Sequence, residues 1–363
     1  MIMMGLEFVG EVPFEDVYIH SVIQAPDGRR MSKSLGTGID PLEEIDKHGA
    51  DGVRFGLLAM SSSQDVRYSA EKVQQGQQLA NKLWNASRLV LTRIDRDARA
   101  AARPRTVEDR WILSRLARTQ AEVAQRIAGY DFSHAALALY DFVYGELCDW
   151  YLELVKPRLY EAEGEERADV SATLLHVLTE TLQMAHPVIP FVTEEIWSHV
   201  PGAEGLLAAR RATPPDEGAI DPDAERQLGD AIEAIQALRG WRDGVGAPAG
   251  ARIPARIEAE GYAQTLAHVA RLARLELDGD GDGAQPVATI AIPGGAVHVL
   301  PTDAVDLGAA ERKLAQRRAT LEREIARCEG KLANAGFVAK APPAVVEAER
   351  AKLARLREEL ASL

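Results

Sequence analysis

Hydrophobic residues recur at intervals of three and four between residues 41 and 200, the spacing of one helix face. Two such series are Tyr140, Val143, Leu147, Trp150, Tyr151 and Leu154, and then Leu174, Leu178 and Leu182. The pattern predicts a bundle of several long helices. Pro157 is expected to end one helix, and Thr193 is expected to cap the start of another after Pro187 and Pro190.

Shorter segments on either side of this region have the composition or alternation of β-strands. Residues 17–23 are rich in β-branched side chains, and the turn residues Pro26-Asp27-Gly28 follow before a loop over 29–41. Residues 201–225 are rich in Gly, Pro and acid and are expected to be an exposed connection. A small mixed unit is then expected, with a helix near 231–239, a strand at 253–257, a helix at 265–275 and a strand at 287–292.

Heptad spacing appears near the C-terminus. The first heptad series consists of Leu314, Leu321, Ile325, Cys328 and Leu332. After a break at 334–343, a second series consists of Val346, Leu353, Leu356, Leu360 and Leu363. Two short heptad helices joined by a turn predict an antiparallel coiled-coil hairpin. From Asp306 onward basic residues outnumber acidic ones, whereas the whole chain has a formal net charge of −13. Nucleic acid therefore stays a candidate partner, because phosphate binding depends on local charge.

The composition, 46% hydrophobic and 27% charged over 363 residues, is that of a soluble protein with two or three domains. No apolar run reaches membrane-spanning length, and we expect the short apolar start at 1–4 to be the end of a buried segment rather than a signal peptide. The two cysteines, Cys148 and Cys328, lie far apart in the sequence, so neither a zinc ribbon nor a disulfide framework is expected. A protein without disulfides is compatible with a reducing cytosol. The acidic turn at 278–283 lacks the later glutamate of a calcium loop, so no protein-bound metal is predicted.

The segment Arg30-Met31-Ser32-Lys33-Ser34 combines cations and hydroxyls in a loop punctuated by glycine. Lys33 supplies a point charge with three donors, suited to non-bridging phosphate oxygens, and Ser32 and Ser34 can add neutral hydrogen bonds. Fixed cations of this kind favour a transition state in which charge builds on a departing pyrophosphate. The alternative is a solvated surface loop with a few basic residues, which is what a short string of this kind usually is.

This loop and the string Gly49-Ala50-Asp51-Gly52-Val53-Arg54-Phe55 behind it resemble the KMSKS signature region of the class I aminoacyl-tRNA synthetases. The resemblance implies that the loop closes over ATP during amino-acid activation. Arg30 stands in place of the first lysine of the signature, which keeps the charge but changes its geometry. Gly36-Thr37 stands where the family usually has Gly-Asn.

Four further strings are similar to members of this family. They are Asn81-Lys82-Leu83-Trp84-Asn85-Ala86, Asp109-Arg110-Trp111-Ile112-Leu113-Ser114-Arg115-Leu116, Cys148-Asp149-Trp150-Tyr151-Leu152-Glu153 and the segment from His186 to Trp197. The C-terminus favours the valine type. Isoleucine enzymes usually end in a cysteine-rich zinc module, whereas residues 331–342 resemble the tip of the coiled-coil arm of valine enzymes.

The resemblance implies a mainly α protein in four parts. These are the end of a Rossmann-type catalytic domain (1–60), a helical-bundle anticodon-binding domain (61–225), a small α/β unit (226–302) and an antiparallel coiled-coil arm (303–363). It further implies ATP-dependent ligation of valine to tRNA(Val), with ATP and Mg²⁺ entering together. The protein is expected to be a cytoplasmic monomer that does not associate with a membrane. Lys33 is the candidate catalytic residue, and residues 30–34 are the candidate ATP-binding residues. The candidate tRNA-binding residues are Arg312, Lys313, Arg317, Arg318, Arg323, Arg327, Lys331 and Lys340.

Two alternatives to this function stay open. The sequence contains no His-x-Gly-His and nothing similar to an editing domain, so we expect a C-terminal fragment that is inactive in pyrophosphate exchange by itself. The alternatives are a non-catalytic tRNA-binding module and an isoleucine- or leucine-type relative with an unusual tail. The residues of the amino-acid pocket and those that read the anticodon are not identified by the sequence.

Several of the residues in these strings also have plain structural explanations. Trp84, Trp111, Trp150 and Trp197 are expected to be core or interdomain packing residues. His186, before a proline, is expected to be a hydrogen-bonded structural residue. The cations of the arm can equally pair with acids on a solvated coiled-coil surface.

Overall fold

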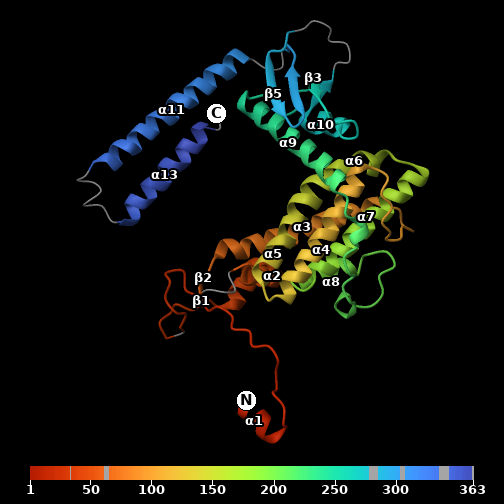
Figure 1. The fold of residues 1–363 in the computed structure, drawn as a ribbon, viewed down its shortest axis with the longest axis vertical. Helices are drawn as coiled ribbons and strands as arrows, with labels where there is room; N and C mark the ends of the chain where they lie inside the picture. The colour runs from red at the N-terminus through yellow and green to blue at the C-terminus, as the bar shows by residue number, and fades with distance from the viewer. Residues whose placement is uncertain (33, 61–64, 278–284, 303–306, 335–342, 362–363) are drawn as a thin grey trace. The chain divides into compact units, whose positions relative to one another are not determined.

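The computed structural model describes residues 1–32, 34–60, 65–277, 285–302, 307–334 and 343–361. It divides into two compact units, residues 1–228 and 229–363 (Figure 1). Both units are built mainly from helices, and each contains one small sheet. The predicted mainly helical protein with small sheets is therefore confirmed.

The first unit runs from a short N-terminal helix through a bundle of long helices. Its elements are α1 (Ile2–Phe8), β1 (Ile23–Gln24), α2 (Pro41–Ala59), β2 (Val66–Arg67), α3 (Ala70–Arg93), α4 (Val107–Ala128), α5 (Phe132–Asp141), the π-helix η1 (Phe142–Tyr151), α6 (Leu152–Glu161), α7 (Gly164–Ala185), α8 (Pro190–Trp197) and the 3₁₀ turns η2 (Leu207–Ala209) and η3 (Glu217–Ala219). Helix α9 (Pro222–Gly244) begins in this unit and continues into the second.

The core of the bundle consists of the apolar faces of α3, α4, α5 and α7. The leucines at 174, 178 and 182 are all buried, as their spacing in the sequence predicts. They are joined by Leu83 from α3 and Ile112 from α4, neither of which is exposed. Burial of these side chains supplies the main stabilisation of the bundle, since isolated helices of this length are only marginally stable in water.

The segment from α5 to α6 departs from the predicted α-helix. Residues Phe142–Tyr151 form a π-helix, in which Val143, Leu147 and Tyr151 are buried at four-residue spacing. The prediction that Pro157 ends a helix is wrong, because Pro157 lies inside α6. The flanking Val155 and Leu159 are buried, and we attribute the continuation of the helix past the missing N–H to the burial of this face.

Helices α2 and α3 pack with their backbones in close contact. A Cβ built on Gly56 would lie 2.7 Å from Val73 Cα, and one on Gly76 would lie 2.7 Å from the Gly52 carbonyl oxygen. No side chain larger than hydrogen fits at these crossings without moving a helix. Within α2, Gly49 (φ 75°) interrupts the helical backbone and divides the element in two.

The N-terminal region holds less regular structure than its pattern predicts. Residues 17–22 lie outside any strand, and the strand predicted over 17–23 is reduced to β1, which pairs in parallel with the two residues of β2. Only Ile23 and Gln24 have a ladder partner, so the strand extends no further. The apolar start is also not buried against the described part of this chain: Met1 precedes α1, Met3 lies in it, and both are exposed, so its place at the end of a buried segment stays a prediction.

The second unit contains a four-stranded sheet of order β4-β3-β6-β5. Its elements are β3 (Ile253–Ala259), α10 (Leu266–Ala273), β4 (Leu275–Leu277), β5 (Ala288–Ile292) and β6 (Gly295–Val299). The predicted helix near 231–239 lies within α9, and β3, α10 and β5 occupy the other three predicted segments. Strands β4 and β6 were not predicted. The acidic turn at 278–283 lies outside the described residues.

The rest of the second unit is a helical hairpin of α11 (Leu307–Ala333) and α13 (Pro343–Ala361), which run side by side (Figure 1). Leu321, Cys328 and Leu356 form its buried core, with Ile325 and Leu353 packed against them. The heptad prediction is confirmed for these positions. Among the described residues, no helix is long and apolar enough to cross a membrane.

The glycine contact between α2 and α3 gives a stability prediction. Gly56→Ala places a methyl group against the Val73 backbone and should lower the free energy of unfolding by about 1–3 kcal/mol or more, as overpacked cores do. Gly240→Ala, in α9 with open space around it, is the control and should stabilise by about 0.5–1 kcal/mol through helix propensity. Urea unfolding followed by circular dichroism measures both, and equal effects would contradict the packing argument.

Candidate functional site

The candidate phosphate loop follows β1 through a tight turn. The Gly28 N–H donates to the Ala25 carbonyl at 2.8 Å, and the Ala25 N–H donates to the Arg29 carbonyl at 2.8 Å. Gly28 has φ +85° and faces the guanidinium group of Arg67, whose Nε would lie 3.1 Å from a Cβ at this position. This turn therefore requires glycine, and it directs the chain from the small sheet into residues 30–37.

A threonine side chain holds the two ends of the 30–37 loop together. The Thr37 hydroxyl donates to the Arg30 carbonyl at 3.1 Å and accepts from the Ser32 N–H at 3.0 Å. The Thr37 N–H donates to the Ser32 carbonyl at 3.2 Å, and the hydroxyls of Ser32 and Ser34 are 2.9 Å apart. The residue by which this chain departs from the Gly-Asn of the signature is thus the residue that closes the loop.

The structure describes four of the five predicted phosphate-binding residues of this loop. Lys33, the candidate catalytic residue, lies outside the described residues. Arg30 and Ser34 are exposed, while Met31 and Ser32 are half-buried. The neighbouring Arg29 is turned to Asp27, with Nη2 2.6 Å from Oδ2, and this ion pair lowers the pKa of the Asp27 carboxyl. Assignment of ATP to residues 30–34 stays a prediction.

Helix α2 is connected to the small sheet by a partly buried hydrogen bond. The Tyr68 hydroxyl, directly after β2, donates to the Glu44 carboxylate in the first turn of α2. This hydrogen bond is the largest cause that lowers the pKa of Glu44, with a further contribution from Lys47. Asp40 caps the start of the helix by accepting from the Leu42 N–H at 2.9 Å. The loop is therefore anchored at its C-terminal end by a fixed helix.

The second half of α2 holds the start of α8. Asp51 is buried and accepts from the N–H groups of Phe191 and Val192 at 3.1 and 2.7 Å. Arg54 donates to the carbonyls of Pro187 and Val188 at 2.9 and 3.3 Å. Two of the family-like strings, 49–55 and 186–197, thus meet here. Desolvation raises the pKa of Asp51, whereas the two N–H donors act in the opposite direction.

The prediction that Thr193 caps α8 is wrong. The helix begins at Pro190, and Asp51 satisfies its first free N–H groups from across the fold. Thr193 lies inside the helix, where its hydroxyl donates to the Ile189 carbonyl at 2.9 Å. His186 Nδ1 lies 2.9 Å from the same hydroxyl oxygen, as expected for a hydrogen-bonded structural histidine.

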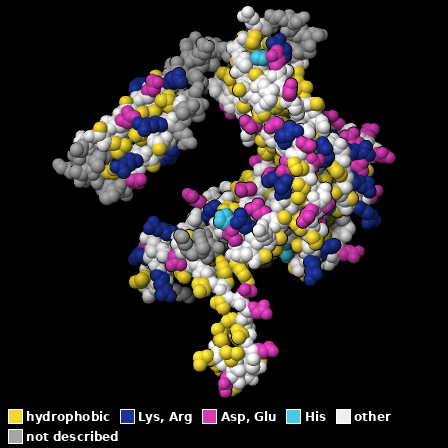
Figure 2. All heavy atoms as spheres, in the orientation of Figure 1, with side chains coloured by type: hydrophobic (Ala, Val, Ile, Leu, Met, Phe, Trp, Pro, Cys, Tyr) yellow, Lys and Arg dark blue, Asp and Glu magenta, His cyan; other side chains and the backbone are white. Residues whose placement is uncertain are grey.

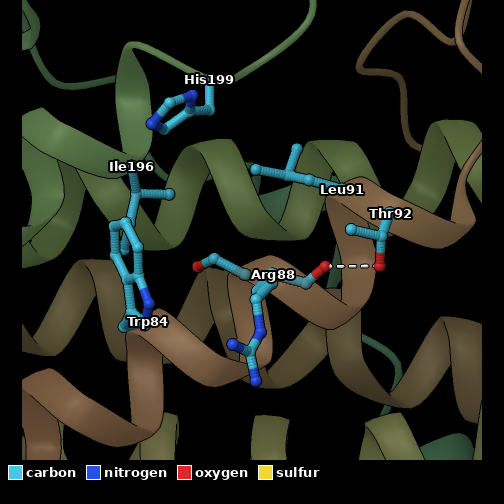
Figure 3. Close-up of a pocket in the computed structure, with 7 residues that line it drawn as sticks. Trp84, Arg88, Leu91, Thr92, Ile196 and His199 are labelled. Atoms are coloured by element: carbon cyan, nitrogen blue, oxygen red, sulfur yellow. Dashed lines mark hydrogen bonds between the residues drawn. The ribbon is translucent and has the colours of Figure 1, made fainter.

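The tryptophans differ in exposure. Trp111 and Trp197 are 4% and 5% exposed, which confirms them as packing residues, and Trp150 is half-buried. Trp84 is 37% exposed and is therefore not a core residue of this unit, whereas the other expected role, packing between domains, stays a prediction. It lies on the side of α3 that lines a cavity against α8, where too few neighbouring atoms are present to cover the ring (Figure 3).

The charges of the coiled-coil hairpin are mixed in sign, as Figure 2 shows along its length. Arg318, Arg323, Arg327 and Lys331 are exposed on α11. Lys331 Nζ lies 3.1 Å from Glu349 Oε1 on α13, so part of the predicted basic set is used for pairing within the hairpin. The side chains of Arg312, Lys313 and Arg317, and the whole of Lys340, lie outside the described residues.

Sequence reasoning did not identify Asp51, Arg54 or Thr37 as contact residues. Each lies in a string that was singled out, but its partner is far away or is a backbone group, which spacing does not reveal. In the described part of the chain, no cluster of three or more His, Cys, Asp or Glu side chains could hold a metal ion.

The tie between Tyr68 and Glu44 gives a pH-dependent prediction. A carboxyl whose pKa is lowered on folding stabilises the fold above its ordinary pKa of 4.5, and this contribution is lost as pH falls through the lower folded value. Tyr68→Phe should therefore cost about 1 kcal/mol at pH 7, and the difference from wild type should shrink below about pH 4.

Thermal unfolding at several pH values measures this difference. Tyr160→Phe is the control, because the Tyr160 hydroxyl has no hydrogen bond among the described residues and its ring lies against Arg93. A cost for Tyr68→Phe that is the same at every pH would show that Glu44 is not the partner that matters.

Comparison with known proteins places these features in one family. Three family models match in order: tRNA synthetases class I (I, L, M and V) at residues 1–69, the anticodon-binding domain of tRNA ligase at 109–257, and the valyl tRNA synthetase tRNA binding arm at 306–363. The solved LeuRS–tRNA–LeuAMS ternary complex of Agrobacterium radiobacter K84 is 22% identical, with a TM-score of 0.49 over 61% of this chain and 26% of that chain.

Curated relatives match almost the entire chain. A valine–tRNA ligase of Clostridium acetobutylicum is 37% identical over 97% of this chain and 41% of its own length, and one of Cereibacter sphaeroides is 38% identical over 100% and 38%. The chain thus spans about two fifths of the length of these relatives. It belongs to the class I aminoacyl-tRNA synthetases and matches the C-terminal part of their valine-type members.

Proposed function

We propose that this chain takes part in the ATP-dependent ligation of valine to tRNA(Val). The observation that carries the proposal is the continuous connection from the 30–37 loop through α2 to the bundle. The loop leads directly into α2, and Asp51 and Arg54 of α2 hold the start of α8. A loop suited to polyphosphate and a helical region similar to an anticodon-binding domain are thereby joined through the two halves of α2, which meet at Gly49.

In this proposal residues 30–34 contact the phosphates of ATP, which enters with Mg²⁺ as its counter-ion. Lys33 stabilises the charge that develops on the departing pyrophosphate, and the neighbouring hydroxyls orient it. Residues 1–60 are the end of the catalytic domain, 61–225 the anticodon-binding domain, 226–302 a connecting unit and 303–363 the tRNA-binding arm. The protein acts in the cytoplasm as a monomer.

The basic face of α11 supports the arm assignment. Arg323, Arg327 and Lys331 follow at four-residue steps, so they lie along one side of the helix. Such a stripe can contact successive phosphates without reading sequence. The alternative function, a tRNA-binding module without chemistry, shares this surface and differs only in the role of the 30–37 loop.

The first experiment titrates the full 363-residue chain with tRNA(Val) at several salt concentrations. Affinity should fall steeply with salt, and replacing Arg318, Arg323 and Arg327 by Gln should reduce the slope of log K against log salt by roughly one for each phosphate that is no longer neutralised. The matched control is Glu322→Gln with Glu324→Gln, on the same exposed helix, which should not weaken binding. An unchanged slope in the arginine variant would remove the arm from the interface.

The second experiment concerns the loop and uses a full-length valine–tRNA ligase that contains this chain. Lys33→Ala should lower the rate of valine-dependent pyrophosphate exchange by about a hundredfold or more while leaving the affinity for valine nearly unchanged, because the charge acts in the transition state. Ser34→Ala in the same loop should have a much smaller effect. An equal loss of rate and of valine affinity for Lys33→Ala would contradict the proposed role.

A further inference from the structure

Helix α2 is divided in two at Gly49, and its two halves are attached to the rest of the first unit in different ways. All the buried residues of α2 lie after the break, from Asp51 onward, where the helix runs beside α3 (Figure 1). The half from 41 to 48 has no buried side chain, and its two large apolar residues, Leu42 and Ile45, are exposed. Burial of apolar surface therefore does not fix the position of this half.

Polar contacts attach the first half instead. Among the described residues, the side chains that form hydrogen bonds to it from other elements are those of Tyr68 and Gln77. Gln77 Nε2 donates to the Lys47 carbonyl at 3.3 Å, and Gln77 Oε1 lies 3.1 Å from His48 Nδ1. The bond to Lys47 fixes which way the amide faces. Because the amide oxygen can only accept, His48 donates from Nδ1.

The main chain of Gln77 is packed against the other half of α2. A Cβ built on Gly52 would lie 3.1 Å from Gln77 N and 3.3 Å from Gln77 Cβ, so α2 and α3 are in direct contact at this residue. The same half carries Asp51, which accepts from the N–H groups of Phe191 and Val192. Gln77 therefore contacts both sides of the break, the anchored half with its main chain and the first half with its amide.

We propose that Gln77 is a positioning residue for the 30–37 loop, because its amide bridge fixes the angle between the two halves of α2. The inference rests on the proposed function, in which this loop contacts the phosphates of ATP. Gly49 has φ +75° and open space around its Cα, so its backbone can adopt other angles at little cost. A change of angle there is passed to the loop, because only residues 38–40 separate the loop from α2.

Hydrogen exchange of the full 363-residue chain tests the bridge without measuring any activity. Gln77→Met keeps the length of the side chain but removes both polar contacts. The amides of residues 45–48 should therefore exchange about tenfold faster, while those of residues 53–59 stay unchanged. Gln78→Met is the matched control, because Gln78 is exposed on the same helix and has no hydrogen bond among the described residues. Identical exchange in wild type and Gln77→Met would overturn the inference.

A second variant tests whether His48 and Gln77 act as one unit. His48→Leu should speed exchange at 45–48 less than Gln77→Met does, because the bond to the Lys47 carbonyl remains. Added to Gln77→Met, it should have no further effect, since the partner of the imidazole is already absent. Additive effects of the two changes would show that the residues act separately, which contradicts a shared bridge.

The consequence for the reaction is measured in a full-length valine–tRNA ligase that contains this chain. Single-turnover rate constants do not depend on the amount of active enzyme, so a loss of folded protein cannot imitate the effect. Gln77→Met should slow the step that releases pyrophosphate by about tenfold, because a displaced loop stabilises the departing charge less well. The later transfer of valine to tRNA(Val) should keep its rate constant, since pyrophosphate has already left. Gln78→Met should change neither step.

The outcomes separate this inference from the proposed function. If Gln77→Met speeds hydrogen exchange but leaves both rate constants at their wild-type values, or lowers both equally, Gln77 only stabilises α2 and the positioning role is overturned. If the wild-type enzyme releases no pyrophosphate from ATP in the presence of valine, the proposed function fails and the positioning role fails with it. Thermal unfolding of each variant checks that the fold is retained.

Discussion

The arrangement of the first unit depends on one buried carboxylate. Asp51 accepts the N–H groups of Phe191 and Val192, which would otherwise be unsatisfied at the start of α8. Burying a charge is costly, and the raised pKa of this carboxyl reflects that cost. The two N–H donors and the positive end of the helix offset it. The 30–37 loop leads into the first half of α2 and Asp51 lies in the second half, after Gly49, so this contact ties the element that follows the loop to the bundle.

Local spacing was sufficient to predict the elements whose contacts are close in sequence. The leucines of α7 are buried as expected, and so are Leu321, Cys328 and Leu356 of the hairpin, because helix periodicity alone decides which side they occupy. The loop at 30–34 was predicted from its residue types, but its closure by Thr37 was not. The partners of Thr37 are backbone groups, and neither residue type nor spacing predicts such contacts.

The predictions that were wrong have a common cause: contacts with distant parts of the chain outweigh the local sequence signals. Thr193 is a good capping residue, yet α8 begins at Pro190 because Asp51, far earlier in the sequence, caps it. Pro157 does not end α6, whose neighbouring side chains are buried. Trp84 was expected either in the core or between domains, and it is not in the core because α8 does not approach α3 closely enough to cover its ring, which the sequence does not state.

The threonine bridge across the 30–37 loop has an energetic consequence for any polyanion that binds there. A free loop must give up its conformational entropy when it closes on a ligand, at a cost of about 1–2 kcal/mol for each backbone residue fixed. Here Thr37 has already restricted the segment from Arg30 to Ser32 before a ligand arrives. Part of that entropy is therefore already lost on folding. Conversely, any rearrangement that widens the loop must first break the same two hydrogen bonds of Thr37.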